Sequence, residues 1–264
     1  MIRRERHGEV VRLQFSNKRS RIVGYSVSAY LVRGVLIDSA FPAVEHDLLE
    51  ALRPQELRGV LISHKHEDHA GNVEALAQTG IPIGLSEATR RAVSNPPPIR
   101  FYRRWTWGTM RPLRTPITPF APTDLSLIAT PGHSDDHHVV WDNTDDSVFA
   151  GDLFLGVKVR VAHPGEDIRR LSASLRHMIA MHPRRLFDGH RGLIPNPVAA
   201  LTAKADWLDV TVERIDGLLR SGADEGQIMK QVMGREQFAG VFSGDDYSRR
   251  NFVRSVIATS AQRR

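Results

Sequence analysis

The chain has 264 residues, of which 41% are hydrophobic, and it contains no cysteine. This composition provides for a buried core and excludes disulfide bonds, thiolate metal sites and a cysteine nucleophile, so reactive chemistry has to use His, Asp, Glu, Ser or Lys. The net charge of +6 is unevenly spread: residues 1–21 carry seven Lys/Arg against two acidic residues, and residues 95–120 carry five Arg and no acidic residue. We therefore expect a mildly acidic core with two basic patches.

The chain carries no sequence signal for a membrane. No segment contains the roughly 18 consecutive apolar residues that a membrane span needs. The basic start MIRRERHGEVVRL lacks the apolar stretch of a signal peptide. A reducing cytoplasm suits a chain without cysteine. We expect a soluble cytoplasmic protein with no membrane partner, and its oligomeric state is open.

Strand-like and helix-like segments alternate along the first 94 residues. The β-branched and aromatic segments that predict strands are 8–15, 22–32, 34–40, 58–63 and 81–86. The helical patterns cover 42–54, 72–80 and 87–94. This alternation is typical of an α/β layer structure.

The second half continues the alternation and then becomes helical. Strands are predicted within 124–133, 137–142, 146–156 and 184–190, and helices over 167–183, 197–222, 223–234 and 246–261. Because several strands follow one another through polar turns, we expect hairpins and therefore mixed sheets.

One stretch, SHKHEDH at residues 63–69, concentrates imidazole and carboxylate directly after a predicted strand. In an extended chain residues two apart project to the same side, so His64 and His66 should converge on one point. Asp68 and His69 follow where the chain turns toward a helix, and they can face a neighbouring point. Imidazole and carboxylate are the usual zinc ligands where thiolates are missing. The pattern predicts two adjacent metal positions.

Four residues do not complete two coordination shells, and further strand ends supply candidates. TPGH ends at His133, AGD at Asp152 and DGH at His190, each directly after a predicted strand. In α/β layer folds, ligands gather outside strand ends. These three side chains are therefore expected to join the first four.

Taken in order, LIDS, SHKHEDH, TPGH, AGD and DGH resemble the metallo-β-lactamase superfamily over about residues 8–195, and most of all its glyoxalase II and β-lactamase-like protein 2 groups. The resemblance implies an α/β fold, an αββα sandwich of two mixed sheets with helices outside. It implies a catalytic domain over 1–195 and a helical C-terminal extension over 196–264, with a winged-helix-like arrangement as one form.

The resemblance also implies the roles of the motif residues. One metal would be bound by His64, His66 and His133, the other by Asp68, His69 and His190, and Asp152 would bridge them. Asp38 would orient the ligand loop without binding metal. His137, four residues after His133, would support the site from outside the ligand set or face the substrate, with a plain structural role as the alternative.

The implied chemistry is that of a dinuclear metal-dependent hydrolase. A hydroxide bound between two divalent ions would attack the substrate, and Asp68 would accept a hydrogen bond from it. Zinc is the expected metal, and iron or manganese also suit the ligands. The leading substrate is a thioester, ester or lactone of a small anionic molecule, as in glyoxalase II. The alternatives are cleavage of single-stranded RNA, a mononuclear iron enzyme similar to persulfide dioxygenases, and a binding module that merely retains metal.

The basic aromatic insert at 95–120 has the most unusual composition in the chain. Its arginines alternate with aromatic residues, which predicts a lid that holds an anionic substrate through Arg100, Arg103, Arg104, Trp105 and Trp107. A dimer contact or a proline-pinned surface loop is the alternative. The helical tail is nearly neutral and lacks the basic footprint of a DNA-binding module, so no DNA partner is expected.

Overall fold

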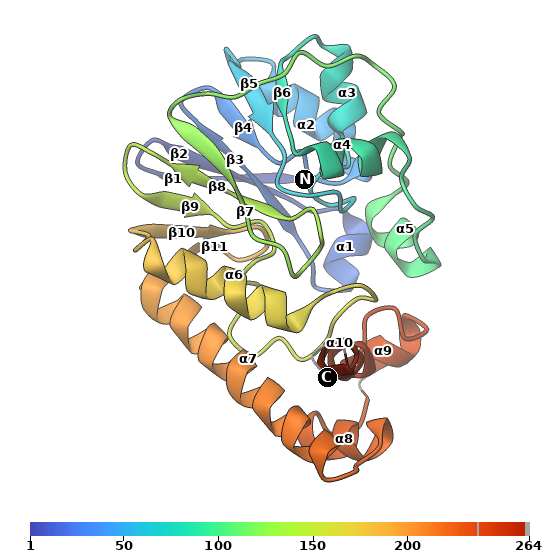
Figure 1. Ribbon diagram of the computed structural model, residues 1–264. Helices are drawn as coiled ribbons and strands as arrows, with labels where there is room; N and C mark the ends of the chain where they lie inside the picture. Colours follow the sequence, from blue (N-terminus) through green and yellow to red (C-terminus); the bar gives the residue numbers. More distant parts are fainter. Residues whose placement is uncertain (237, 262–264) are drawn as a thin grey trace. The chain divides into compact units, whose positions relative to one another are not determined.

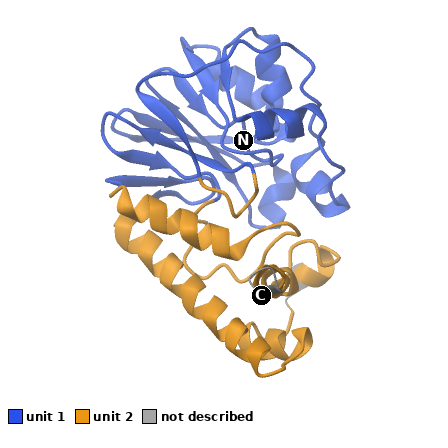
Figure 2. Cartoon of the chain, viewed as in Figure 1, with its two compact units in different colours: residues 1–129, 136–152, 183–195 blue, residues 130–135, 153–182, 196–264 orange. Residues whose placement is uncertain are grey.

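The computed structural model describes residues 1–236 and 238–261, and these fall into two compact units (Figure 2). Unit 1 comprises residues 1–129, 136–152 and 183–195, and unit 2 comprises residues 130–135, 153–182 and the chain from 196 onward. The sequence placed a single boundary at 195/196. The structure instead groups two internal stretches of the expected catalytic domain with the C-terminal helices.

Unit 1 is built on a six-stranded sheet with the order β1-β2-β3-β4-β5-β6 (Figure 1). The first four strands pair antiparallel, whereas β5 runs parallel to both β4 and β6. The strands span Ile2–His7, Val10–Phe15, Val27–Val32, Val35–Ile37, Gly59–Leu61 and Ile83–Gly84. The parallel half places the ends of β4 and β5 at one edge of the sheet.

A second sheet of unit 1 has five strands in the order β11-β10-β9-β8-β7. Here β9 and β10 run parallel and the other neighbours antiparallel. The strands span Leu125–Ala129 (β7), His138–Asp142 (β8), Ser147–Phe149 (β9), Arg185–Asp188 (β10) and Gly192–Ile194 (β11). Both sheets are mixed, as the sequence predicts.

Alternation of side chains along the strands makes two apolar layers. In β4, Leu36 belongs to the cluster shared with helices, while Val35 and Ile37 belong to the cluster shared with the second sheet. The rings of Tyr30, Phe149 and Phe187 form the centre of the layer between the sheets, with centroids 5.1 to 5.4 Å apart. Face-to-face packing of two sheets therefore forms the core of unit 1.

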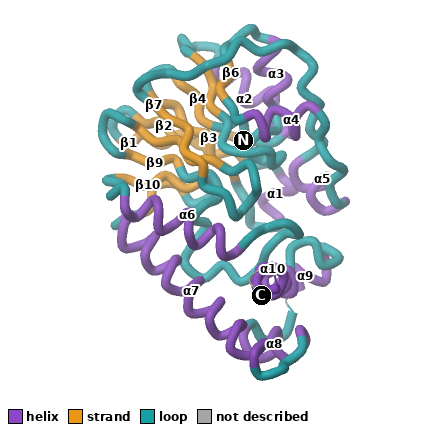
Figure 3. The backbone as a smooth tube through the Cα atoms, in the orientation of Figure 1, coloured by secondary structure: helices purple, strands orange, loops and turns teal. Residues whose placement is uncertain are grey.

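Helices cover the outer face of the six-stranded sheet, as Figure 3 shows in purple against the orange strands. Leu48 of α2, Leu76 of α3 and Val93 of α4 pack in the same cluster as Leu36. The helices of unit 1 span Lys18–Ile22 (α1), Glu45–Leu52 (α2), Val73–Gln78 (α3), Glu87–Ser94 (α4) and Phe101–Trp107 (α5), with a 3-10 turn, η1, at Pro42–Val44.

The 95–120 segment contains a helix, α5, which the sequence did not predict. Trp107 at its end is buried against the ring of Phe41, with centroids 4.8 Å apart. Farther along, Leu113 donates its N–H to Val93, and Glu74 accepts from the backbone of Arg114. These contacts attach the segment to the helical layer of unit 1.

Unit 2 consists mainly of helices, and α6 packs along α7. Asp167 caps α6 by accepting from the backbone N–H of Arg169, and α7 begins with a proline in its first turn. Arg169 also pairs with Asp216 of α7. The helices span Ile168–Ala180 (α6), Pro197–Arg220 (α7), Glu225–Val232 (α8), Phe238–Phe242 (α9) and Arg249–Ala261 (α10).

Two expectations from the sequence concern a winged-helix arrangement of these helices and a membrane-spanning segment anywhere in the chain. Among the described residues of unit 2, the β pairing is an isolated bridge between Ala162 and Ser248, so no hairpin forms the wing of a winged helix there. Over residues 1–236 and 238–261, we find no helix with the length and apolar character that crossing a membrane requires.

Replacing Phe149 with Ala removes a ring that is 1% exposed between the two sheets. We expect the free energy of unfolding to fall by about 3–5 kcal/mol, because a buried ring is lost and a cavity remains. Urea denaturation measures this loss. Phe101→Ala, at a position 69% exposed, should change the free energy by less than about 0.5 kcal/mol. Equal losses in the two variants would contradict the core described above.

Candidate metal centre

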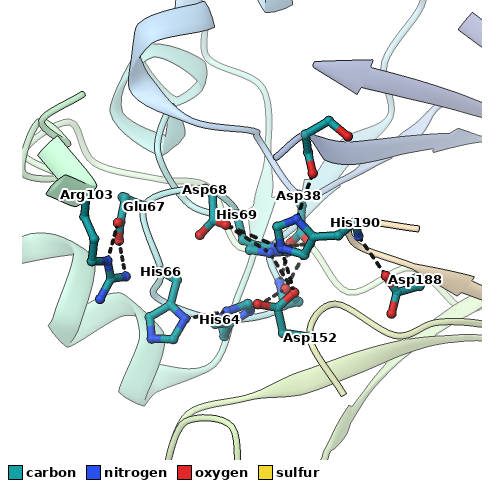
Figure 4. Close-up of polar contacts among 12 residues, drawn as sticks. Asp38, His64, His66, Glu67, Asp68, His69, Arg103, Asp152, Asp188 and His190 are labelled. Carbon is teal, nitrogen blue, oxygen red and sulfur yellow. Dashed lines mark hydrogen bonds and ion pairs between the residues drawn. The ribbon is translucent and has the colours of Figure 1, made fainter. Parts of the chain in front are cut away.

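Four strand ends deliver the candidate ligands of unit 1 to one place (Figure 4). Asp38 follows β4, and the ligand loop 63–69 follows β5. Asp152 comes three residues after β9, and His190 comes two residues after β10. Because β4 and β5 are parallel to each other, as are β9 and β10, each pair of strands ends at a common edge.

Asp38 holds the ligand loop through contacts with both ends of it, Ser63 and His69. The backbone of Asp38 is left-handed (φ 61°), and its side chain is buried. The carboxylate accepts hydrogen bonds from the backbone N–H of Ser63 (2.8 Å) and from the Ser63 hydroxyl (3.0 Å), and it lies 2.8 Å from Nδ1 of His69. This contact turns Nε2 of His69 toward the other candidate ligands.

His64 and His66 lie on one side of the loop, as their spacing predicts. Nε2 of His64 lies 3.1 Å from Nδ1 of His66, and Nδ1 of His64 lies 2.9 Å from the Ser63 hydroxyl. The residue between them is held by Asp136, which accepts from the Lys65 backbone N–H at 2.8 Å. The loop is therefore anchored before His64 and between the two histidines.

His137 supports the strand end that carries Asp152. The backbone N–H of Asp152 donates to Nε2 of His137 at 3.1 Å, and the His137 ring is 1% exposed. Gly151 stands between them with φ 48°, and a Cβ there would lie 2.9 Å from the same nitrogen. The geometry thus gives His137 a supporting contact to Asp152 within unit 1.

His190 is held through Nδ1 of its ring, which lies 2.8 Å from the backbone carbonyl oxygen of Ser26. Its Nε2 lies 3.2 Å from Oδ1 of Asp152 and 3.5 Å from Oδ2 of Asp68. The preceding Gly189 leaves no room for a side chain, because a Cβ would lie 2.7 Å from the His69 ring. The chain can therefore pass close enough for these groups to meet.

Two groups of potential ligand atoms result, each with all atoms within 4.8 Å of one another. One consists of Asp68, His69 and His190. The other contains His64, His66 and Asp152 of unit 1. Oδ1 of Asp152 lies 3.1 Å from Nε2 of His69, so it adjoins the first group as well.

The donor set fits divalent metal ions. Nε2 of His69 is buried, and in residues 1–236 and 238–261 it has no hydrogen-bond partner, although it lies close to carboxylate oxygens. A buried imidazole nitrogen without such a partner, surrounded by carboxylates and further imidazoles, is typical of a metal ligand. His and Asp residues are thus positioned for metal binding.

The protonation of the histidines follows from burial and from the carboxylates. Burial, assisted by His69 and His66, lowers the pKa of His64 well below its usual value. Burial also acts to lower the pKa of His190, but the negative charge of Asp152 outweighs it and raises that pKa to about 9. His69 has its pKa raised for the same reason. In the metal-free protein, protons on two histidines compensate the carboxylate charge.

A comparison with known families agrees with this geometry. The family model described as the metallo-beta-lactamase superfamily matches residues 22–190. The chain belongs to the metallo-β-lactamase superfamily. Members of this superfamily are typically metal-dependent hydrolases, and the His/Asp cluster fits such a site. The family and the fold class predicted from the motifs are confirmed.

Relatives within the superfamily are distant. The chain is 28% identical to a beta-lactamase-like protein 2 homolog of Drosophila melanogaster, over 54% of this chain and 47% of that protein. It is 27% identical to a hydroxyacylglutathione hydrolase of Shewanella denitrificans, over 42% of this chain and 36% of the relative. The chain spans about half the length, or less, of these two relatives.

Solved structures support the superfamily fold. DIM-1 metallo-β-lactamase exposed to ceftazidime matches with a TM-score of 0.61 and 16% identity, over 79% of this chain and 97% of the other. At this identity the likeness concerns the fold alone. The activity of the present superfamily member has to be argued from its own residues.

A buried ion pair inside the superfamily motif was not predicted. Glu67, between His66 and Asp68, is 3% exposed, and both its carboxylate oxygens accept from the Arg103 guanidinium, at 2.6 and 2.5 Å. The sequence assigned Arg103 to the substrate. Its two-pronged pairing with Glu67 instead binds α5 to the ligand loop. An acidic residue within the motif was the available signal, but its partner lies 36 residues away.

The other predicted substrate contacts divide by exposure. Arg100 and Arg104 are exposed, and Trp105 is half-buried. Trp107 is 8% exposed and belongs to the core cluster beside Phe41. Its burial does not support the expected contact with substrate, because the packed ring has little surface to offer.

We expect Asp38→Asn to weaken metal binding by about 10- to 100-fold, because an amide nitrogen would face groups that now donate to the carboxylate. Competition with a chromogenic chelator measures the affinity. Asp47→Asn is the matched control, since its side chain is 45% exposed and pairs with the N-terminus. Unchanged affinity in Asp38→Asn would show that Asp38 does not position the ligand loop.

Metal binding should release protons at neutral pH. With its pKa near 9, His190 is protonated in the metal-free protein at pH 7, and a metal must displace that proton. Apparent metal affinity should therefore rise between about pH 7 and pH 9. The raised pKa has the opposite effect on the metal-free fold: its stabilisation is complete below the usual value of 6.5 and is lost as the pH rises through about 9.

Calorimetric titration of the metal at pH 7, in two buffers with different ionisation enthalpies, measures the proton release. The observed binding enthalpies should differ between the buffers in proportion to the number of protons released. Equal enthalpies would mean that no ligand loses a proton.

Proposed function

We propose that this protein is a hydrolase that uses two divalent metal ions, zinc as the expected metal, to cleave a thioester, ester or lactone of a small anionic substrate. One observation carries the proposal: two groups of ligand atoms adjoin at Asp152, whose Oδ1 lies 3.1 Å from Nε2 of His69 and 3.2 Å from Nε2 of His190. Such adjoining groups suit a pair of ions rather than one.

In this proposal each side chain has a defined role. One ion would be held by His64, His66 and His133, and the other by Asp68, His69 and His190. Asp152 would serve both, since its Oδ1 lies close to Nε2 of His69 and of His190. Divalent ions, when bound, supply Lewis acidity that lowers the pKa of water and polarises the oxygen of the bond under attack. The Asp68 carboxylate, 11% exposed, accepts a hydrogen bond from the attacking water and so directs its lone pair at the substrate.

Two observations support the substrate class. A relative named hydroxyacylglutathione hydrolase shares 27% identity over part of the chain, which favours a thioester. The arginine-rich 95–120 segment, without acidic residues, favours an anionic substrate. The chain has no cysteine, so hydrolysis here proceeds without a cysteine nucleophile.

RNA phosphodiester cleavage is a second candidate. The motifs resemble the β-lactamase-like protein 2 group, and homologs with that name in Drosophila melanogaster and Caenorhabditis elegans match the chain at 28% and 24% identity. Exposed Arg100 and Arg104 beside exposed Phe101 favour contacts with phosphates and bases.

Removing a ligand should abolish metal binding and hydrolysis together. We expect His66→Ala and Asp152→Ala to lose at least one equivalent of metal and about 100-fold or more in kcat/KM, because the attacking water is no longer activated. His177→Ala, at an exposed position on α6, is the control and should keep both. Full activity in a variant with an emptied site would refute the proposal.

A substrate panel identifies the bond. Initial rates are measured on S-lactoylglutathione, an acyl-coenzyme A, a set of lactones and a labelled single-stranded RNA, alongside the metal content of protein purified without added metal. Cleavage of RNA alone, abolished by chelation, would replace the leading proposal with the second candidate. One equivalent of iron and no hydrolysis would indicate a mononuclear oxygenase instead.

A further inference from the structure

Two short helices of unit 1 form a basic surface. Arg19 of α1 donates to the backbone carbonyl of Trp105 in α5, and its guanidinium lies 5.9 Å from the centre of the Trp105 ring. Asn17, which caps α1, donates to the carbonyl of Thr106 at 3.2 Å. We call this the α1–α5 surface, and its exposed cations are Lys18, Arg19, Arg21, Arg100 and Arg104.

These cations have no acidic partners. Neither helix contains an acidic residue, and none of the five side chains forms an ion pair with any described residue. Some other exposed arginines of unit 1 are paired, such as Arg90 of α4 with Glu87 and Arg111 with Glu45. A set of unpaired like charges raises the local positive potential and favours an anionic ligand.

Aromatic and apolar side chains stand among the cations. Phe101 is 69% exposed and Tyr25 is 45% exposed, although Tyr25 packs edge-on against the buried Trp107, with centroids 6.3 Å apart. Exposed rings between arginines can stack on a planar base while the guanidinium groups hold phosphate oxygens. A ligand whose only charged groups were carboxylates, without a planar base, would make no contact of this kind with the rings.

Two links join this surface to the metal centre. The backbone carbonyl of Ser26, next to Tyr25, holds Nδ1 of His190 at 2.8 Å. Arg103, between exposed Arg104 and half-buried Tyr102, pairs with Glu67 of the ligand loop (Figure 4). The surface is therefore connected to one candidate ligand and to the ligand loop, and a site for the non-reacting part of a substrate belongs close to such a centre.

We propose that the α1–α5 surface binds a nucleoside phosphate carried by the substrate, through Arg100, Arg104 and the cations of α1, with Phe101 and Tyr25 against the base. The inference rests on the proposed function for the bond that is cleaved. The same chemistry occurs in the nucleotide portion of a coenzyme A thioester and in single-stranded RNA. A membrane surface is disfavoured, because helices of five and seven residues offer a short apolar face.

Binding under conditions in which the enzyme cannot cleave the ligand tests the surface. Coenzyme A and, with metal removed by chelator, an eight-nucleotide single-stranded RNA are titrated into the 264-residue protein, with glutathione as the phosphate-free comparison. We expect Arg100→Ala/Arg104→Ala to raise Kd for coenzyme A, for the RNA or for both at least tenfold. The dependence of Kd on salt should weaken in the same variant.

Arg6→Ala/Arg53→Ala is the matched control, because it removes two exposed arginines outside α1 and α5. It should leave both Kd values within twofold. The proposal is overturned if neither nucleotide binds, if both double variants weaken binding equally, or if the protein binds anionic phosphatidylglycerol vesicles in place of the nucleotides. A shift for coenzyme A alone indicates a thioester substrate, and a shift for the RNA alone indicates the polymer.

Hydrolysis of p-nitrophenyl acetate by the metal-loaded protein separates this inference from the proposed function. Nucleotide binding that depends on Arg100 and Arg104, without any hydrolysis, would support the α1–α5 surface and contradict the proposed hydrolase. Hydrolysis without nucleotide binding would support the hydrolase and contradict the surface.

Discussion

The buried carboxylate of Asp38 is the constraint on which the candidate site depends. It accepts two hydrogen bonds from Ser63 and contacts Nδ1 of His69, so the end of β4, the end of β5 and one candidate ligand share a single side chain. The parallel pairing of β4 with β5 brings these groups together in the first place. The buried carboxylate is tolerated there because Ser63 and His69 provide hydrogen-bonding contacts to its oxygens. Strand pairing and ligand orientation are thus parts of one arrangement.

Much of this arrangement could be predicted from local patterns. The spacing of His64 and His66 after a strand, and the small motifs ending at Asp152 and His190, mark strand ends whose side chains meet in the structure. Mixed sheets and the long helix from Pro197 also followed from periodicity. These features depend on short-range sequence, such as alternation, turns and caps, which is why they can be read without coordinates.

Features that depend on partners far apart in the chain could not be predicted. The pairing of Glu67 with Arg103, the burial of Trp107 against Phe41, and the grouping of α6 with the C-terminal helices each need tertiary packing. Composition correctly marked the 95–120 segment as unusual, but it gave no means to separate Arg103, which pairs internally, from Arg100 and Arg104, which stay exposed. The proposed nucleotide surface arises from that separation.

The order of the ligand-bearing segments along the chain has a consequence for biosynthesis. The candidate ligands begin at His64 and end at His190, and Asp152 reaches its neighbours only through the parallel pairing of β9 with β10. A ribosome-bound chain that has not yet exposed residue 190 lacks the last candidate ligand and the strand that positions the Asp152 carboxylate. The set of candidate ligands is therefore complete only late in translation, after slow long-range sheet formation. Before that point, His64, His66 and His69 alone would bind an unsuitable ion weakly.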